Sequence, residues 1–324
     1  SMAALQGSPL PEAINDRIYW TNNALLFYTE HTVGYHASIR EPFHKYTMEQ
    51  RAIKESYAWE AGRRSKMIGE EALGLLQSHI TKEEKPSVVV WNSLNWAKNG
   101  LVKVYMDHQL VPPDKKFSII DREGNQVPAQ PVESHNDGTY WALWVENVPA
   151  FGYKKYVIEV SDEPKKKGNG NEKNLALENQ WYKIEVDHER GAITRLFDKA
   201  LNKELVDQEA RWKMGEFIYE TLGKRGQLDG FYLDDYQRVP LDSVWFEGYE
   251  KGEIWNTISF SGNTEAAIRD EEYSFEIRLF NTTKRIDLAY FILKKSVTDP
   301  EGIYIALPFK LNEGIISFDV QGGE

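Results

Sequence analysis

The sequence predicts a multidomain α+β protein: a helical hairpin followed by a small antiparallel β-sandwich and a second, larger β-sandwich. Three observations predict this order. Residues 9–80 place apolar side chains at helical spacing, residues 86–160 and 175–324 consist of short β-forming runs, and a polar stretch separates these two parts. A length of 324 residues is enough for two or three domains.

Residues 9–80 are expected to form two long helices, which amount to a partial three-helix bundle. The first helix places apolar residues on one side, namely Ile14, Ile18, Leu25 and Leu26. Gly34 ends or bends it, and the second helix is expected to begin at Thr47, because Gln50 three residues later completes a capping box. Since a stable bundle usually has three or four helices, two helices leave apolar surface that needs a partner.

Residues 86–160 are predicted to form the small sandwich. The β-rich runs are short and close together: 88–91, 101–106, 117–120, 140–145 and 153–160. Turn signals lie at 121–125 and 149–152. Short strands joined by such turns favour antiparallel pairing.

Residues 161–174, SDEPKKKGNGNEKN, contain no apolar side chain and are predicted to be a solvated linker. Strand-like runs then continue through residues 175–324, which we expect to form the larger sandwich. Because the sequence closes on Gly322, Gly323 and Glu324 without a further strand signal, we expect that sandwich to be truncated.

Composition excludes several classes of function. With 39 Lys and Arg against 50 Asp and Glu, the net charge of -11 disfavours nucleic acid and membrane surfaces as partners. The absence of Cys excludes disulfides, thiolate zinc sites and a thiol nucleophile, so that His, Asp and Glu remain as metal ligands. No membrane span or signal peptide is predicted, and the compartment stays open between cytoplasmic and periplasmic or secreted.

Residues 30–36, EHTVGYH, are the densest group of metal-capable side chains, at the predicted end of the first helix. His31 and His36 are five residues apart, so a continuous helix would point them to different faces, and they are not expected to share one metal ion. The residues alone leave His31 open between a structural role and a ligand. Motifs for acyl transfer, nucleotide chemistry and zincin proteolysis are absent from the sequence.

Several short motifs, taken in order, carry a resemblance. They are LLFYTEH at 25–31, VWNSLNW at 90–96, VPAFGY at 148–153, LENQWYKIEVD at 177–187 and GAITRLFDK at 191–199. Together they resemble the middle and C-terminal regions of glycoside hydrolase family 38, the retaining, metal-dependent α-mannosidases. The resemblance implies the last two helices of that family's bundle, its small β-domain and a large sandwich of the galactose-mutarotase-like type.

The resemblance also implies a site. His31 matches a histidine that is one ligand of a zinc ion, which grips adjacent hydroxyls of mannose. Thr32 stands where the family often has an Asp that contacts the sugar, and Glu30 and His36 are further weak candidates for substrate binding. The catalytic barrel, which holds the nucleophile, the acid/base and the other metal ligands, would precede residue 9.

The chain is therefore expected to be a non-catalytic fragment of an α-mannosidase that acts on α-mannoside glycans. Alone, it is expected to be inactive, to hold zinc weakly or not at all, and to self-associate through the bare apolar side of its helices. Two other functions remain open. One is a carbohydrate-binding or scaffolding module, in which Trp141, Trp144 or Trp245 stacks on sugar rings. The other is a sugar lyase or epimerase built on a mutarotase-like sandwich.

Overall fold

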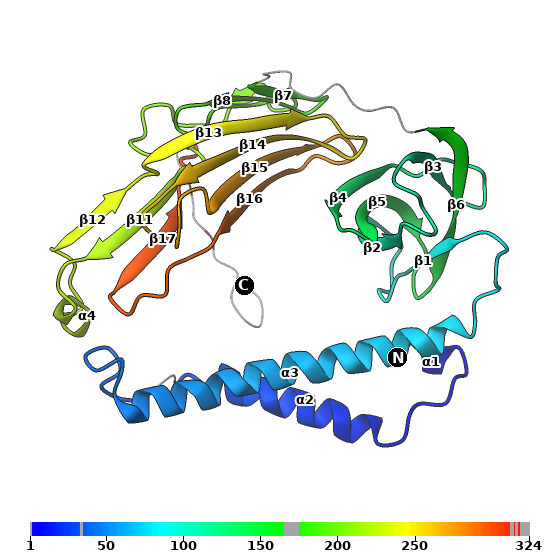
Figure 1. Cartoon of the computed structure of the whole chain (residues 1–324), viewed down its shortest axis with the longest axis horizontal. Coiled ribbons are helices and arrows are strands. Elements are labelled where there is room, and N and C mark those ends of the chain that lie inside the picture. The colour runs from blue at the N-terminus through cyan, green and yellow to red at the C-terminus, as the bar shows by residue number, and fades with distance from the viewer. Residues whose placement is uncertain (1, 33–34, 165–174, 312–313, 315–316, 318–324) are drawn as a thin grey trace.

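The computed structural model describes residues 2–32, 35–164, 175–311, 314 and 317. Helices at the N-terminal end are followed by several small antiparallel β-sheets, so that the chain is mostly β with some helix. The helix pair lies along one side of the molecule, and two groups of sheets lie above it (Figure 1).

Two long antiparallel helices, α2 (Ile14–Thr29) and α3 (Lys45–Gln77), form the predicted hairpin, and a single turn, α1 (Met2–Leu5), precedes them. The expected start of the second helix at Thr47 is wrong. The helix begins at Lys45, because the His44 side chain accepts the Tyr46 N–H at 3.3 Å and so caps it. The Thr47 hydroxyl instead donates to the Glu41 carbonyl at 3.1 Å. The expected bend at Gly34 lies outside the described residues.

The helix pair buries few of its apolar side chains. Ala24, Ala61 and Leu76 are buried, whereas Leu26 is 68% exposed and Trp59 is 79% exposed. The helix pair therefore presents several large apolar side chains to solvent. None of the helices in the described part of the chain is both long and apolar enough to cross a membrane.

The first group of sheets follows α3 and consists of two three-stranded sheets. One has the order β1-β6-β3 and the other the order β2-β5-β4. Their strands are β1 (Ser87–Trp91), β2 (Lys98–Asp107), β3 (Lys115–Ile120), β4 (Ala129–Ser134), β5 (Gly138–Val148) and β6 (Tyr153–Pro164). Ile119, Leu143 and Tyr156 come from both sheets and meet in one core, so the two sheets pack face to face.

Strand β6 is longer than predicted and extends to Pro164, four residues into the stretch expected to be a linker. Cross-strand ion pairs explain the difference. Lys115 and Lys116 on β3 pair with Asp162 and Glu163 on β6 at 3.0 and 2.7 Å, which gives this charged segment partners in the sheet. The rest of the predicted linker, residues 165–174, lies outside the described part.

The second group of sheets is larger and begins after residue 175. Its sheets have the orders β10-β9-β8-β7, β12-β11-β17 and β13-β14-β15-β16. The strands are β7 (Ala176–Glu178), β8 (Tyr182–Asp187), β9 (Ala192–Asp198), β10 (Lys203–Glu204), β11 (Phe217–Leu222), β12 (Tyr236–Val239), β13 (Ser243–Glu250), β14 (Trp255–Asn263), β15 (Tyr273–Phe280), β16 (Ile286–Ile292) and β17 (Glu301–Ile305). All three sheets contribute to one core that includes Ile184, Phe217 and Phe275.

Two polar side chains link the first group of sheets to its neighbours: one reaches the second group of sheets, and the other reaches the segment after α3. Gln130 on β4 reaches the second group of sheets, where its Oε1 accepts the N–H groups of Ile254 and Trp255 at 3.2 and 3.1 Å. Lys155 on β6 is almost fully buried and donates to the Thr81 carbonyl and to Glu83 Oε1, the latter at 2.9 Å. The segment that leaves α3 is thereby fixed against the first group of sheets.

Candidate functional site

His31 lies directly after the end of α2. The helix ends at Thr29, and Glu30 takes an extended conformation while its N–H still donates to the Leu26 carbonyl at 3.0 Å. The His31 side chain is 97% exposed, with Nδ1 2.9 Å from Glu30 Oε1. A carboxylate in this position holds the proton on Nδ1 and leaves Nε2 as the ring nitrogen that is open to a ligand.

Glu30 is held by two further groups. The Thr32 hydroxyl donates to Oε1 at 2.7 Å, and the Lys54 ammonium donates to Oε2 at 3.1 Å. The hydrogen bonds from Thr32 and then Lys54 lower the pKa of Glu30 from 4.5 to about 2. The carboxylate is thus ionised throughout the physiological range and places a negative charge beside Nδ1 of His31.

Lys54 on α3 is a neighbour of Glu30 that the sequence did not reveal. Its side chain is only 12% exposed, and its ammonium donates to the carbonyls of Phe27 at 2.8 Å and Glu30 at 2.6 Å. The last turn of α2 contains no basic residue of its own. Lys54 therefore supplies, from the neighbouring helix, the positive charge that favours a helix C-terminus.

The other two predicted site residues, Thr32 and His36, differ in their surroundings. Thr32 is engaged with Glu30, whereas the His36 ring is exposed and packs beside Tyr35 at a centroid distance of 4.1 Å. Tyr35 in turn stacks on His44 at 5.1 Å. Within the described ranges, no three His, Asp or Glu side chains converge on a point where they could hold a metal ion.

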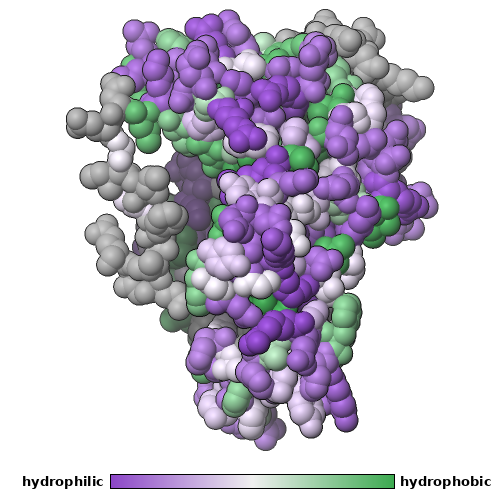
Figure 2. Space-filling view, turned by 90° about the vertical axis from the view of Figure 1, so that its left-hand side faces the viewer, coloured by the Kyte–Doolittle hydropathy of each residue, from purple (hydrophilic) through white to green (hydrophobic). Residues whose placement is uncertain are grey.

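The loop after His31 contacts the second group of sheets at helix α4 (Gly226–Gly230). Arg40 lies 3.0 Å from Asp229, and Arg225 donates to the Ile39 carbonyl at 2.6 Å. Figure 1 shows this meeting point at the left end of the molecule, and Figure 2 shows that hydrophilic side chains cover most of that face. The His31 end of the helix pair is therefore placed next to the second group of sheets.

A second cluster of charged and aromatic side chains lies on the sheet next to α4. The Glu220 carboxylate is only 5% exposed and accepts hydrogen bonds from Arg238 Nε and, at 3.1 Å, from the Tyr304 hydroxyl. The bond to Glu220 raises the pKa of Tyr304. Arg238 also lies over the half-exposed ring of Tyr236 at 4.8 Å. Three strands supply these residues, so only the strand register could reveal the cluster.

The fold places a helix pair before two groups of antiparallel sheets, and the second group matches a known family model. Residues 177–323 match the model of the glycosyl hydrolases family 38 C-terminal domain. This part of the chain is thus a C-terminal domain of that family, which confirms the resemblance found in the sequence.

Solved structures agree with this assignment. An α-mannosidase from Enterococcus faecalis V583 has 10% identity and a TM-score of 0.55, with 86% of this chain and 37% of its own chain covered. A protein in glycosyl hydrolase family 38 from Enterococcus faecalis has 11% identity and a TM-score of 0.56, with 89% and 40% covered. The chain thus spans less than half the length of these proteins, and at such identities the likeness concerns the fold. A comparison with curated protein sequences gave no match.

Proposed function

We propose that this chain forms the helical and β-domain part of an α-mannosidase and has no complete catalytic centre of its own. The observation that carries the proposal is the family match over residues 177–323, in a chain whose helix pair and sheets together share the fold of family 38 proteins. In this proposal the sheets after residue 175 begin a galactose-mutarotase-like sandwich. The substrates of the whole enzyme are α-mannosides of glycans.

The proposed role of His31 is to supply one nitrogen ligand to a zinc ion. Its exposed side chain and the Glu30 carboxylate at Nδ1 fit this role, because metal-binding histidines usually donate their other ring N–H to such a partner. A catalytic zinc ion takes three protein ligands, whereas the described residues bring no three donors together. The remaining ligands would come from a barrel in a longer protein, and this chain alone should not retain zinc.

When bound, zinc would grip adjacent hydroxyls of a mannose ring. The residues of this chain would hold the ligand in place: Lys54 fixes the end of α2, Glu30 orients the His31 ring, and Thr32 holds Glu30. Thr32 and Glu30 already bind each other. Of the three weak candidates, His36 is therefore the one whose side chain is most available for contact with sugar.

The test uses the longest protein that the gene encodes, with His31→Gln as the variant and His36→Gln as the control for zinc content alone. We expect His31→Gln to lose bound zinc, measured by elemental analysis, and at least about 100-fold of its rate on an aryl α-mannoside. His36→Gln should keep its zinc. Full zinc occupancy in His31→Gln, or enzyme-like turnover by residues 1–324 alone with added zinc, would overturn the proposal.

A further inference from the structure

The sheet β13-β14-β15-β16 has one apolar face and one polar face. The apolar face packs on β7 and β8, which lie above it in Figure 1, and buries Ile258, Phe260, Phe275 and Ile277. Side chains alternate between the two faces along each strand, so the neighbouring positions point to the other side. On that polar face the central strands carry Ser259, Ser261, Ser274 and Glu276. The centre of the polar face is therefore hydrophilic.

An aromatic side chain stands at each end of one row across the polar face. The strand register aligns one residue from each strand in this row, which we call the aromatic row: Trp245, Ser261, Ser274 and Phe291. Trp245 is 41% exposed and Phe291 is 58% exposed. They lie on the two edge strands of the sheet, so three interstrand spacings, about 14 Å, separate their backbones. Two small hydroxyl side chains therefore lie between two accessible aromatic rings.

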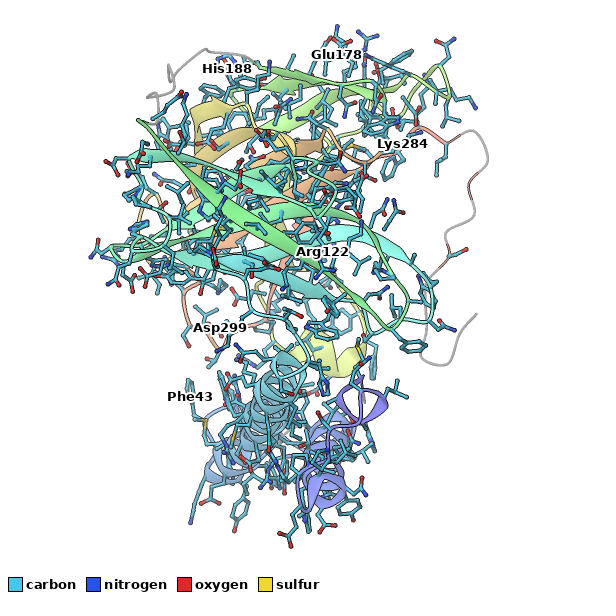
Figure 3. All side chains as sticks on the ribbon, turned by 90° about the vertical axis from the view of Figure 1, so that its right-hand side faces the viewer. Phe43, Arg122, Glu178, His188, Lys284 and Asp299 are labelled. Carbon is cyan, nitrogen blue, oxygen red and sulfur yellow. The ribbon has the colours of Figure 1, made fainter. Side chains whose placement is uncertain are left out.

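The opposite end of the polar face is covered. Trp255 and Phe280 pair across β14 and β15 on this side of the sheet, and they pack against Ala142 and Trp144 of the first group of sheets. This contact lies beside the turn between β15 and β16, where Figure 3 labels Lys284. The first group of sheets thus covers one end of the face, whereas the aromatic row lies toward the other end and keeps its two rings exposed.

Trp245 is one of the three tryptophans considered from the sequence for contact with sugar, and the other two have different surroundings. Trp141 packs edge-on against Phe117 at 4.6 Å, and Trp144 packs against the cluster that contains Trp255. These two rings are engaged in contacts within the β-domains. The structure therefore favours Trp245 among the three.

The charged side chains beside the aromatic row bind other side chains of the same face. Each of two arginines has a carboxylate partner: Arg278 Nε donates to Glu276 at 2.8 Å, and Arg285 donates to Asp287 at 2.8 Å. A third carboxylate, Glu247, accepts the hydroxyl of the serine that β14 contributes to the row. These five charged groups sum to a negative charge, so an anion such as phosphate would be repelled and a neutral ligand is favoured.

The placement of these groups argues against a protein as the ligand. Protein interfaces gather aromatic residues at the centre, where charged residues are depleted. On this face the aromatic rings lie on the edge strands, and serines and the Glu276–Arg278 pair lie on the central strands. A sugar chain suits this order, because its hydroxyl groups both donate and accept hydrogen bonds and the C–H faces of its rings pack on aromatic side chains.

We propose that the polar face binds a neutral, extended oligosaccharide, with one sugar ring on Trp245, another on Phe291, and hydrogen bonds from Ser261 and Ser274 to the sugar between them. One sugar ring is too short to contact both aromatic side chains, whose backbones are about 14 Å apart. The site is non-catalytic, and it goes beyond the proposed function because it uses neither His31 nor zinc.

The experiment is calorimetric titration of the chain with three neutral hexasaccharides: an α-linked mannohexaose, maltohexaose and cellohexaose. The matching methyl monosaccharides test whether a chain of rings is needed, and hexagalacturonate tests whether anions are excluded. We expect at least one neutral hexasaccharide to bind saturably. Its affinity should exceed those of its methyl monosaccharide and of hexagalacturonate by at least about tenfold.

Trp245→Ala and Phe291→Ala each remove one ring of the aromatic row, and each should weaken hexasaccharide binding about tenfold. Trp96→Ala and Phe43→Ala are the matched controls and should leave binding unchanged. Both side chains are exposed, but Trp96 lies between β1 and β2, and Phe43 lies beside the helix pair, where Figure 3 labels it. Trp245→Phe keeps an aromatic ring and should retain most of the affinity, which separates loss of the ring from loss of folding.

Five results would overturn the inference. They are no saturable binding of any neutral hexasaccharide, equal affinity for a hexasaccharide and its methyl monosaccharide, tighter binding of hexagalacturonate, binding unchanged in both Trp245→Ala and Phe291→Ala, and an equal loss in the two controls. A shift in self-association caused by Trp245→Ala, measured by light scattering, would assign the face to a second copy of the chain and would overturn it as well. None of these results depends on zinc or on mannoside hydrolysis.

Discussion

Glu30 is the residue that links the end of α2 to the His31 ring. Its pKa of about 2 lies below its ordinary value of 4.5, so its bonds to Thr32 and Lys54 stabilise the folded state fully above about pH 4.5 and are lost as the pH falls toward 2. Because Thr32 contributes most to the lowered pKa, we expect Thr32→Val to raise the pKa of Glu30 toward 4.5. Carboxyl NMR titration measures this directly.

Thr29→Val is the matched control, since the Thr29 hydroxyl donates to the Leu26 carbonyl and does not bind Glu30. The difference in unfolding free energy between the unmodified chain and Thr32→Val should be largest near neutral pH and vanish near pH 2. A Glu30 titration midpoint that is equal in the two proteins would show that Thr32 does not hold this carboxylate.

The sequence predicted the position of His31 but not its surroundings. A histidine at the end of a helical pattern is visible from local spacing, and its neighbour Glu30 is adjacent in the chain. Lys54 is 24 residues from Glu30, and its role depends on how α2 and α3 pack, which spacing within each helix does not determine.

At the scale of elements, the helix pair exposes apolar side chains that usually find a partner. Leu26 on α2 and Trp59 on α3 are 68% and 79% exposed, and Met67 and Leu73 follow on α3 at 50% and 59%. We expect the chain to self-associate through this surface, with an apparent mass in light scattering that rises with concentration. The double variant Leu26→Gln and Trp59→Gln should shift the association to higher concentration.

Phe231→Gln is the control for this prediction, because Phe231 is 98% exposed but lies at the end of α4, outside the helix pair. It should leave the association unchanged. A constant monomer mass at high concentration, or an equal effect of both substitutions, would show that the helix pair does not drive association.

The pattern of apolar residues predicted the two long helices and many of the strands, but it missed strands such as β4 and β11, and the ends of the predicted elements depended on side-chain partners. The start of α3 moved to Lys45 because His44, and not Thr47, caps the helix. The end of β6 moved to Pro164 because Lys115 and Lys116 lie opposite its acidic residues. The first contact joins the His44 side chain to a backbone N–H two residues away, and the second joins side chains on two strands whose pairing follows from folding; periodicity of apolar residues encodes neither.

At the scale of the whole molecule, the order of the parts could be predicted from the sequence, whereas the contacts between them could not. A change from helical spacing to short β-forming runs marks the first boundary, and the resemblance to family 38 identified the second group of sheets. Gln130 gives no comparable signal, because a glutamine at this position in a strand is ordinary on a solvent-facing surface. Gln130 matters because Ile254 and Trp255, at the start of β14 in another sheet, donate hydrogen bonds to its side chain.

The hydrogen bonds of Gln130 make amide exchange a measure of how often the two groups of sheets separate. The N–H groups of Ile254 and Trp255 belong to one group, and their acceptor belongs to the other. Deuterium should therefore enter these two positions only when the groups part, and Gln130→Leu should accelerate the exchange there while Ile258, deep in β14, stays protected. Equal protection of Ile254 and Trp255 in the variant would instead mean that their shielding comes from burial within their own sheet.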